Sequence, residues 1–230
     1  LKAHSGRHEI VAGRPLPEAL LQPNPDDVRQ GGGNLRRQLE VIQMHGPTAV
    51  VAVNAFPDDH PEDLAAVEEV AAECGARAVV SRHFTDGGAG AVELARAVAD
   101  AAEEPGEFRL LYPDQMSLRD KIHTVATQVY GAGAVDYSST AKRQLDAFED
   151  RGLGGLPVCI AKTHLSLTAD PSIKGAPTGW TLPVREVRAS TGAGFVTPIC
   201  GEMRTMPGLG SRPALQRIDI DADGNVVGLS

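Results

Sequence analysis

Several features that would place a protein in a specialised class are scarce in this sequence. The three cysteines, Cys74, Cys159 and Cys200, lie far apart, which argues against a disulfide framework or a zinc site and favours reduced thiols. No apolar run approaches the roughly 20 residues that cross a bilayer, and no signal segment opens the sequence. These absences predict a cytoplasmic protein without a membrane partner.

Basic residues are outnumbered, with 22 Lys and Arg against 30 Asp and Glu and a net charge of -8. No basic stripe is available to neutralise phosphates, so we expect no nucleic-acid partner. Two phosphate-binding motifs are missing as well: GxxxxGK[ST] occurs nowhere, and no GxGxxG follows a strand-like run. What remains is an ordinary globular chain of 230 residues, 42% hydrophobic, which can bury one large or two small cores.

The clearest pattern covers residues 48–90. An apolar run, TAVVAVN, precedes a polar turn, an amphipathic segment over 61–74 and a stop at Gly75, and a second apolar run fills 77–81. Asp58 and Asp59 are candidate helix caps, and acidic residues in the first turn suit the helix dipole. The order predicts a parallel, Rossmann-like βαβ unit, and hence an α/β fold.

One aromatic residue follows each predicted strand of this unit, Phe56 after the first and Phe84 after the second. Parallel sheets bind ligands beyond the carboxyl ends of their strands, so two flat apolar faces would overhang one crevice. From these residues alone, the alternative is that both rings seal the edge of the sheet.

A glycine-rich turn, TDGGAG over 85–90, precedes a predicted helix over 91–104. Backbone N–H groups ahead of a helix can converge on an anion, which makes Gly87 and Gly88 candidate ligand contacts. A tight turn capped by Asp86 explains the same residues without a ligand.

The rest of the chain divides by composition. Residues 1–47 form a partial N-terminal segment, with an irregular surface excursion over 13–33 and a helix over 34–45, and 48–105 form the βαβ part. Residues 106–155 form a mainly helical segment, with a short strand at 110–112 and helices over 115–129 and 140–150, the first exposing Arg119, Asp120 and Lys121.

Residues 156–230 form a subdomain rich in strands and loops that we expect to pack on the βαβ layer. Asp221, Asp223 and Asn225 alternate like the start of a calcium loop, but the distal Glu is missing, so a hairpin turn is favoured. His123 has no second His or Cys at ligand spacing. No metal ligands are therefore assigned.

Three phrases in the last part are long and particular: LPVCIAKTHLSLTADP (156–171), VREVRASTGAGFV (184–196) and MRTMPGLGSRPA (203–214). Together with VVAVNAFPDD and the terminal RIDIDADGNVVGL, they resemble the formate–tetrahydrofolate ligase family in order over almost the whole chain. The chain looks like the C-terminal part of such an enzyme, beginning at the segment LKMHGG of the family, here LKAHSG, so it would be a fragment of a P-loop NTPase-like fold.

The resemblance implies an activity. The family joins formate to tetrahydrofolate with ATP and Mg²⁺, through formyl phosphate, and gives 10-formyltetrahydrofolate. A monovalent cation, K⁺ or NH₄⁺, supports it, and the usual assembly is a homotetramer. The small-molecule partners of the complete enzyme would be tetrahydrofolate, formate and ATP.

The resemblance also assigns roles to residues. By motif position, Phe56 and Phe84 hold the pterin ring of the folate, which agrees with the crevice argument. The second position is commonly Trp in the family, so Phe84 should weaken the stacking. Pro57 and Lys162 join Gly87 and Gly88 as candidate residues next to substrate or nucleotide, and a solvated or ion-paired Lys162 is the alternative. His164 stands where Gln is common and receives no catalytic role.

The phosphate cradle and the catalytic Arg and Lys of the family are expected upstream of Leu1. The isolated chain should then bind folate weakly at best and not turn over. A non-catalytic folate-binding module, either a truncated product or a partner of a separate P-loop chain, is the alternative function.

Overall fold

The computed structural model describes residues 1–8, 10, 14–201, 213 and 216–228. The segment over 203–212 and residue 214, which hold most of the third family phrase, lie outside the described residues. Within the described residues, no helix is long and apolar enough to cross a membrane.

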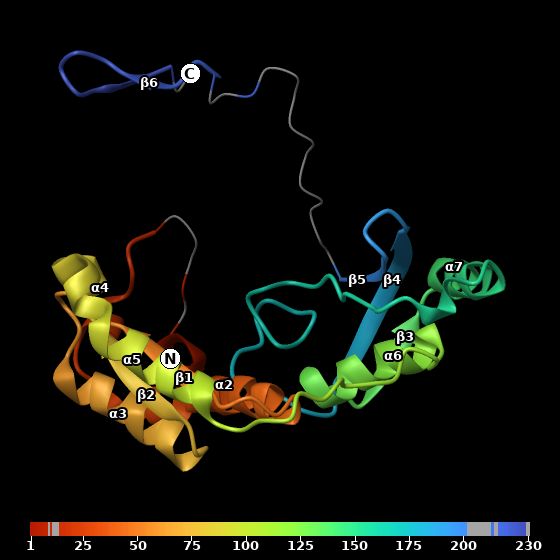
Figure 1. Ribbon diagram of the computed structural model, residues 1–230, viewed down its shortest axis with the longest axis horizontal. Coiled ribbons are helices and arrows are strands. Elements are labelled where there is room, and N and C mark those ends of the chain that lie inside the picture. The colour runs from red at the N-terminus through yellow and green to blue at the C-terminus, as the bar shows by residue number, and fades with distance from the viewer. Residues whose placement is uncertain (9, 11–13, 202–212, 214–215, 229–230) are drawn as a thin grey trace.

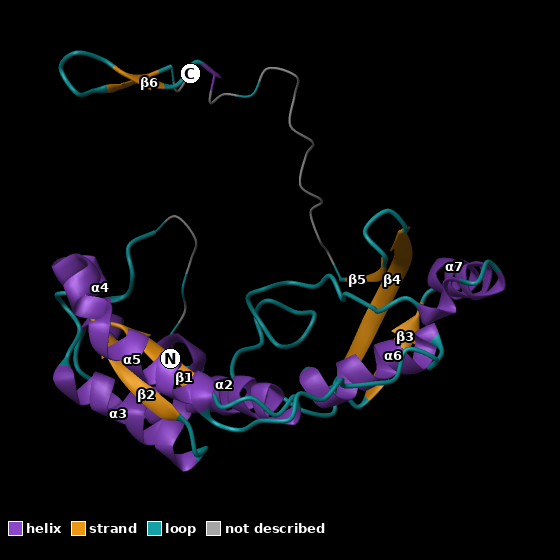
Figure 2. Cartoon of the chain, in the orientation of Figure 1, coloured by secondary structure: helices purple, strands orange, loops and turns teal. Residues whose placement is uncertain are grey.

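Helices and strands alternate along the described chain, which confirms the predicted α/β class (Figures 1 and 2). In order they are η1 (Lys2–His4), α1 (Glu18–Leu21), α2 (Pro25–Met44), β1 (Val50–Asn54), α3 (Pro61–Glu73), β2 (Arg77–Ser81), α4 (His83–Asp86), η2 (Gly87–Ala91), α5 (Val92–Glu103), α6 (Leu118–Thr124), the π-helix η3 (Val125–Val129), β3 (Ala134–Tyr137), α7 (Ser139–Asp150), η4 (Leu153–Gly155), β4 (Thr181–Ser190), β5 (Phe195–Cys200), β6 (Asp219–Ile220) and β7 (Val226–Val227).

The βαβ unit forms as predicted. β1 pairs in parallel with β2, with Val50 opposite Arg77 and Asn54 opposite Ser81. α3 connects the strands, begins with a proline in its first turn and is followed by Gly75, whose φ of 70° ends the helix. The predicted caps are wrong: His60 is the N-cap residue, and Asp59 instead accepts a hydrogen bond from the Phe56 amide at 2.8 Å.

The predicted irregular excursion over 13–33 is also wrong in its second part, because α2 already begins at Pro25. Asn24 caps it by accepting a hydrogen bond from the Asp27 amide. Three consecutive glycines then lie inside the helix, although glycine costs about 1 kcal/mol per residue there. A side chain at Gly31 would lie 2.1 Å from the Leu1 carbonyl oxygen, and one at Gly32 would lie 3.0 Å from Val70. The glycines therefore let neighbouring segments approach the helix closely.

A second sheet, in the order β3-β4-β5, occupies the later part of the chain. β3 runs parallel to β4, and β5 runs antiparallel to β4. β3 lies in the segment expected to be mainly helical, and residues 110–112 form no strand. The apolar run at 157–161 makes only two isolated bridges to β5, from Val158 and Ala161.

This second sheet packs on α6 and α7, not on the βαβ layer as we expected. Its core joins buried residues of the strands to buried residues of the helices, namely Leu118, Ile122, Ala126, Ala132, Ala141, Leu145, Leu182, Val184, Val187, Val196 and Cys200. The core of the βαβ unit is a separate and smaller cluster, namely Leu39, Ala49, Ala71 and Ala76. We call residues 1–105 the βαβ half and residues 106–201 the sheet half.

Lys121 is the largest departure from the predicted surface pattern, because it is 0% exposed. Its ammonium group donates to the carbonyl oxygens of Asp114 at 2.7 Å, Gly154 at 2.8 Å and Leu156 at 3.0 Å. Burial lowers the pKa of Lys121. The side chain thus ties α6 to two loops of the sheet half.

The two halves are joined through α2. The Arg37 guanidinium donates to the carbonyl oxygens of Val129 at 3.0 Å, Thr127 and Gln128, at the end of η3. The predicted C-terminal hairpin also forms, with β6 antiparallel to β7 and Asp221 accepting from the turn amides, and it is drawn apart from both halves in Figure 1.

Candidate functional site

The two aromatic residues predicted from the sequence lie side by side at the carboxyl ends of β1 and β2. The ring centroids of Phe56 and Phe84 are 5.0 Å apart, and the ring planes are tilted by 55°. Phe56 is 49% exposed and Phe84 is 65% exposed. Since neither ring is buried against the sheet, sealing the sheet edge does not account for them.

The turn that carries Phe56 is held by local bonds. The Ala55 amide donates to the Ser81 carbonyl of the neighbouring strand at 2.9 Å, and the Asp59 amide donates to the Phe56 carbonyl at 3.0 Å. The Phe56 amide also donates to the Asp59 carboxylate. Together these hydrogen bonds fix the backbone on both sides of the Phe56 ring. Pro57 lies exposed in the same turn. The backbone is therefore set, while the Phe56 ring projects into solvent.

Phe84 lies on α4, a short helical turn that the sequence did not predict. The predicted glycine-rich turn forms η2, and its Asp86 makes no capping hydrogen bond. Gly87 and Gly88 are exposed, and no atom lies within 4 Å of the place where a side chain would begin at either. The surface around these two glycines is thus open next to Phe84.

A pocket of about 430 Å³ lies along β1, from Val51 to Asn54. Apolar side chains make up most of its lining, and Asn54, Asp59 and Asp63 add polar groups. The lining residues are Leu1, Lys2, Ala3, Val28, Leu35, Val51, Ala52, Val53, Asn54, Asp59, Asp63, Leu64 and Val67. Leu64 and Val67 of α3 are only half-buried, and both line this pocket.

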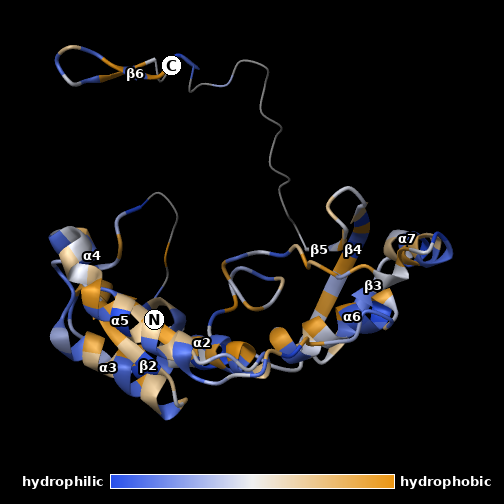
Figure 3. Ribbon diagram, in the orientation of Figure 1, coloured by the Kyte–Doolittle hydropathy of each residue, from blue (hydrophilic) through white to orange (hydrophobic). Residues whose placement is uncertain are grey.

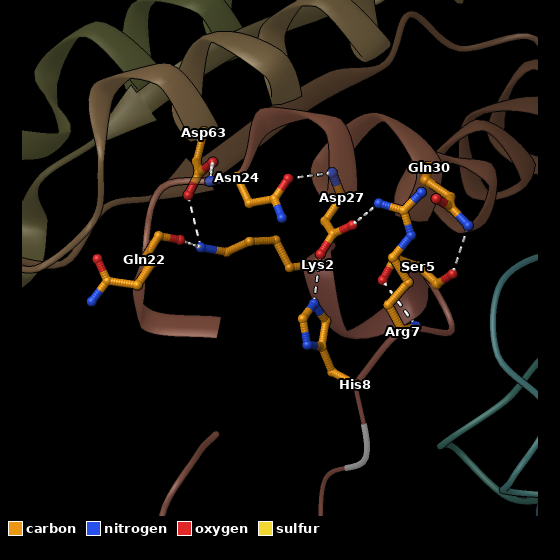
Figure 4. A network of polar contacts seen from close by, with 9 residues as sticks. All are labelled: Lys2, Ser5, Arg7, His8, Gln22, Asn24, Asp27, Gln30 and Asp63. Atoms are coloured by element: carbon orange, nitrogen blue, oxygen red, sulfur yellow. Dashed lines mark hydrogen bonds and ion pairs between the residues drawn. The ribbon is translucent and has the colours of Figure 1, made fainter. Parts of the chain in front are cut away.

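A polar network next to this pocket was not found from the sequence (Figure 4). Lys2 donates to Asp63 at 2.7 Å, and Asp63 also accepts from the Asn24 amide at 2.8 Å. Asp27, which is 1% exposed, accepts from Arg7 at 2.7 Å and lies 2.6 Å from His8 Nε2. The bonds with His8 and Arg7 hold the pKa of Asp27 below its usual range despite burial.

These contacts tie the first eight residues to α2 and α3. Asp26 and Asp27 follow Asn24 as two consecutive acidic residues, but Arg7, the partner of Asp27, lies 20 positions away. Lys2 and Asp63 are 61 positions apart. Local spacing could not identify them.

Lys162 is half-buried, and no ion pair joins it to a described residue. It donates to the carbonyl oxygens of Thr163 at 3.1 Å, Thr168 at 3.3 Å and Ser166, and its ammonium lies 4.6 Å from the Tyr130 ring centroid. Burial lowers its pKa. Lys162 lines a pocket of about 310 Å³ between the halves, away from the pocket at β1.

The remaining candidates make few contacts. His123 and His164 are exposed, and Glu186 forms ion pairs with Arg185 and Arg188 at the surface. The three cysteines are free. Among the described residues, no group of three or more His, Cys, Asp and Glu could hold a metal ion.

Comparison with known proteins gives one consistent result. The sequence model of the family described as "Formate--tetrahydrofolate ligase" matches residues 1–230. Proteins of that name from Saccharopolyspora erythraea and Cutibacterium acnes are 64% and 53% identical to this chain, and "Formate--tetrahydrofolate ligase 3" of Rubrobacter xylanophilus is 60% identical. Each match covers 100% of this chain but only 41%, 41% and 42% of these relatives, in that order. The chain therefore spans about two fifths of their length.

Proposed function

The chain belongs to the formate–tetrahydrofolate ligase family, and on that basis we propose that it forms the folate-binding and C-terminal part of an ATP-dependent ligase. This ligase joins formate to tetrahydrofolate through formyl phosphate and yields 10-formyltetrahydrofolate. A cytoplasmic homotetramer is part of the same proposal, as is the view that the βαβ unit belongs to a P-loop NTPase-like fold.

The observation that carries the folate assignment is the exposed pair of rings beyond the carboxyl ends of two parallel strands. A reduced pterin is a flat heterocycle, and contact with aromatic faces favours its binding through dispersion and loss of hydration. Pro57 and the open glycines Gly87 and Gly88 flank the rings, so they are proposed neighbours of the bound ligand.

The rings have to separate to hold a heterocycle between them. Their centroids are 5.0 Å apart, whereas two faces that sandwich a third ring are about 7 Å apart, twice a contact distance of about 3.5 Å. Because both side chains are exposed, a rotamer change at Phe84 can open this gap without disturbing a core. The Phe56 turn, fixed by its backbone bonds, then serves as the stationary wall.

ATP, Mg²⁺ and the monovalent cation have no evident site in the part of the chain that is described. The sequence lacks GxxxxGK[ST], Lys162 is bound to backbone carbonyls, and no suitable metal-ligand cluster occurs among the described residues. These groups do not fit the residues present, so no step is derived through them. We propose that the longer polypeptide typified by the relatives supplies phosphate binding and the catalytic Arg and Lys.

A replacement experiment tests this function. A chimaera carries this chain in place of the matching two fifths of the Saccharopolyspora protein, and the 230-residue chain alone is the comparison. The chimaera should form 10-formyltetrahydrofolate in a reaction that depends on ATP and formate, while the chain alone should only bind tetrahydrofolate weakly. A folded but inactive chimaera would contradict the ligase function. Turnover by the chain alone would contradict the proposal that the longer polypeptide supplies phosphate binding and the catalytic Arg and Lys.

The second candidate function is a non-catalytic folate-binding module. It is favoured by the same aromatic pair combined with the missing phosphate motif. In that case, the chain alone should bind tetrahydrofolate as tightly as the chimaera does. Isothermal titration of both proteins separates the two functions.

A further inference from the structure

The pocket that contains Lys162 lies at the junction of the two halves, and we call it the junction pocket. Its volume of about 310 Å³ is at the lower end of the range for small-molecule sites. The βαβ half contributes His4, Asn34 and Gln38 to the lining, and the sheet half contributes residues of the loop that carries Lys162. The pocket shares no lining residue with the aromatic pair.

The charge of the junction pocket sets it apart from its neighbours. Its ionisable side chains are those of His4, Tyr130, Lys162 and His164, and no described carboxylate lines it. Four other pockets in the described residues each include at least one carboxylate in their lining, namely Glu104, Asp59 with Asp63, Glu40 and Asp136. In a chain with 30 acidic residues and a net charge of -8, a pocket with basic groups and no acid attracts anions selectively.

The positive charge of Lys162 has only neutral partners among the described residues. Its ammonium donates to the carbonyl oxygens of Thr163, Ser166 and Thr168. It also lies 4.6 Å from the Tyr130 ring centroid. These contacts hold the group in place but leave a half-buried cation without an opposite charge. Because its three N–H groups are occupied, Lys162 would act on an anion through its charge.

Other side chains of the lining have N–H groups left to donate. Burial is the main cause that lowers the pKa of His4, and the Gly175 amide donates to its Nδ1 at 3.4 Å. The neutral ring therefore carries its proton on Nε2. Asn34 donates one N–H to the Gly175 carbonyl at 3.4 Å and keeps the second. The side chains of Gln38 and His164 are exposed and form no hydrogen bond with a described residue.

We propose that the junction pocket binds a single small oxyanion of the phosphate type. Donors from both halves surround it, which suits an anion that accepts hydrogen bonds on several sides better than a planar carboxylate. Neither a glycine-rich phosphate motif nor a metal-ligand cluster accompanies the pocket in the described residues, so a nucleotide does not fit. The bound anion would contact both halves and fasten one to the other. This inference does not rest on the proposed function.

The first test is a titration with potassium phosphate at constant pH, followed by the NMR signals of the histidine rings. Potassium chloride at equal ionic strength is the control, since it separates binding from screening. The ring signals of His4 and His164 should shift to saturation in phosphate alone, with a dissociation constant on the order of 1 mM. The melting temperature should rise over the same range of concentration, because the anion binds the folded chain. Acetate should bind more weakly than phosphate.

A matched pair of variants tests whether the charge of the lining matters. Gln38→Glu adds a carboxylate to the pocket and should weaken phosphate binding at least about fivefold. Gln115→Glu makes the same change of charge at an exposed residue outside the lining, so the affinity should change less than about twofold.

Lys162→Gln removes the cation but keeps an amide that can donate to the loop carbonyls. It should weaken binding about tenfold. Circular dichroism checks that the variant folds. If Lys162→Gln does not fold, the comparison of Gln38→Glu with Gln115→Glu decides.

Three results would overturn the inference. The first is a shift of the His4 and His164 signals that does not saturate or that potassium chloride reproduces. The second is an equal loss of affinity in Gln38→Glu and Gln115→Glu, because the effect would then come from net charge. The third is acetate binding as tightly as phosphate, since the pocket would then not select a phosphate-type anion.

Discussion

The two halves of this chain differ in how well they cover their own apolar surface. In the sheet half, long side chains such as Leu118, Ile122 and Leu182 are completely buried. In the βαβ half the main cluster is mostly alanine, and α5 buries no residue at all. In Figure 3, α5 is coloured largely as hydrophobic and α7 largely as hydrophilic, so the helix without buried residues is the more apolar of the two.

On the proposed function, this difference separates stability from binding. Apolar side chains that remain exposed in the βαβ half include both rings of the candidate site, so we propose that this half provides binding surface at the expense of core. The sheet half has a larger core and an internal cation that fixes its loops. We therefore expect substitutions in the sheet half to change stability and substitutions in the βαβ half to change affinity.

The largest expected effect comes from Lys121→Met, which should destabilise the sheet half. The variant keeps the buried stem but leaves three carbonyl oxygens without their charged donor, so it should lower the free energy of unfolding by about 3–5 kcal/mol. Urea unfolding followed by the fluorescence of Trp180, which packs against the sheet-half core, measures this. The exposed Lys142→Met is the control, and a similar small change in both variants would show that water replaces the ammonium.

Phe56→Ala should have the next largest effect, on binding alone. Loss of one stacking face should weaken tetrahydrofolate binding by about 10- to 100-fold, while the unfolding midpoint stays the same because the ring is half-exposed. Titration of the chimaera provides the affinity. Phe108→Ala removes another exposed ring, outside the candidate site, and a matching loss there would show that the effect is not local.

Asp27→Asn would test whether the βαβ half is held by its polar network. The pKa of Asp27 is lowered in the folded protein, so its ionised form stabilises the fold. That contribution is fully present above the unfolded pKa of about 3.9 and disappears as the pH falls through the lower folded value. The difference in melting temperature between the wild type and the variant should therefore be constant near pH 6 and should shrink below pH of about 4. A difference that grows on acidification would contradict the assigned ion pairs.

Phe84→Trp should have the smallest effect. It tests whether a change in the βαβ half can alter affinity without altering stability. The larger face should tighten tetrahydrofolate binding by about two- to fivefold and leave the unfolding free energy unchanged, since Phe84 is 65% exposed. The same titration measures it. Weaker binding would show that the site is shaped around the smaller ring.

The sequence was sufficient for the elements whose signals are local. The βαβ unit follows from two apolar runs, Gly75 and a proline in the first turn of the helix, and the adjacency of Phe56 and Phe84 follows from parallel pairing. The N-cap of α7 at Ser138 is a local feature as well, because its hydroxyl accepts from the Ala141 amide three residues later.

What could not be predicted depends on contacts distant in sequence. The glycines of α2 predict a break in the helix from local sequence, but the helix continues through them, and Leu1 and Val70 lie close to Gly31 and Gly32. Lys121 follows the pattern of a surface residue, but its three carbonyl partners include two that lie more than 30 positions away. The pocket at β1 combines four segments, so no single stretch reveals it.

The three glycines of α2 also differ in how they would tolerate engineering. At Gly31 any side chain would meet the Leu1 carbonyl at 2.1 Å, so this position is closed to substitution. At Gly33 the nearest atom would be the Ala176 side chain at 3.9 Å, an ordinary contact distance. Alanine at Gly33 would therefore keep the fit and remove backbone freedom from the unfolded chain. Gly31 is therefore required for steric reasons, whereas Gly33 is a position where a substitution can raise thermal stability.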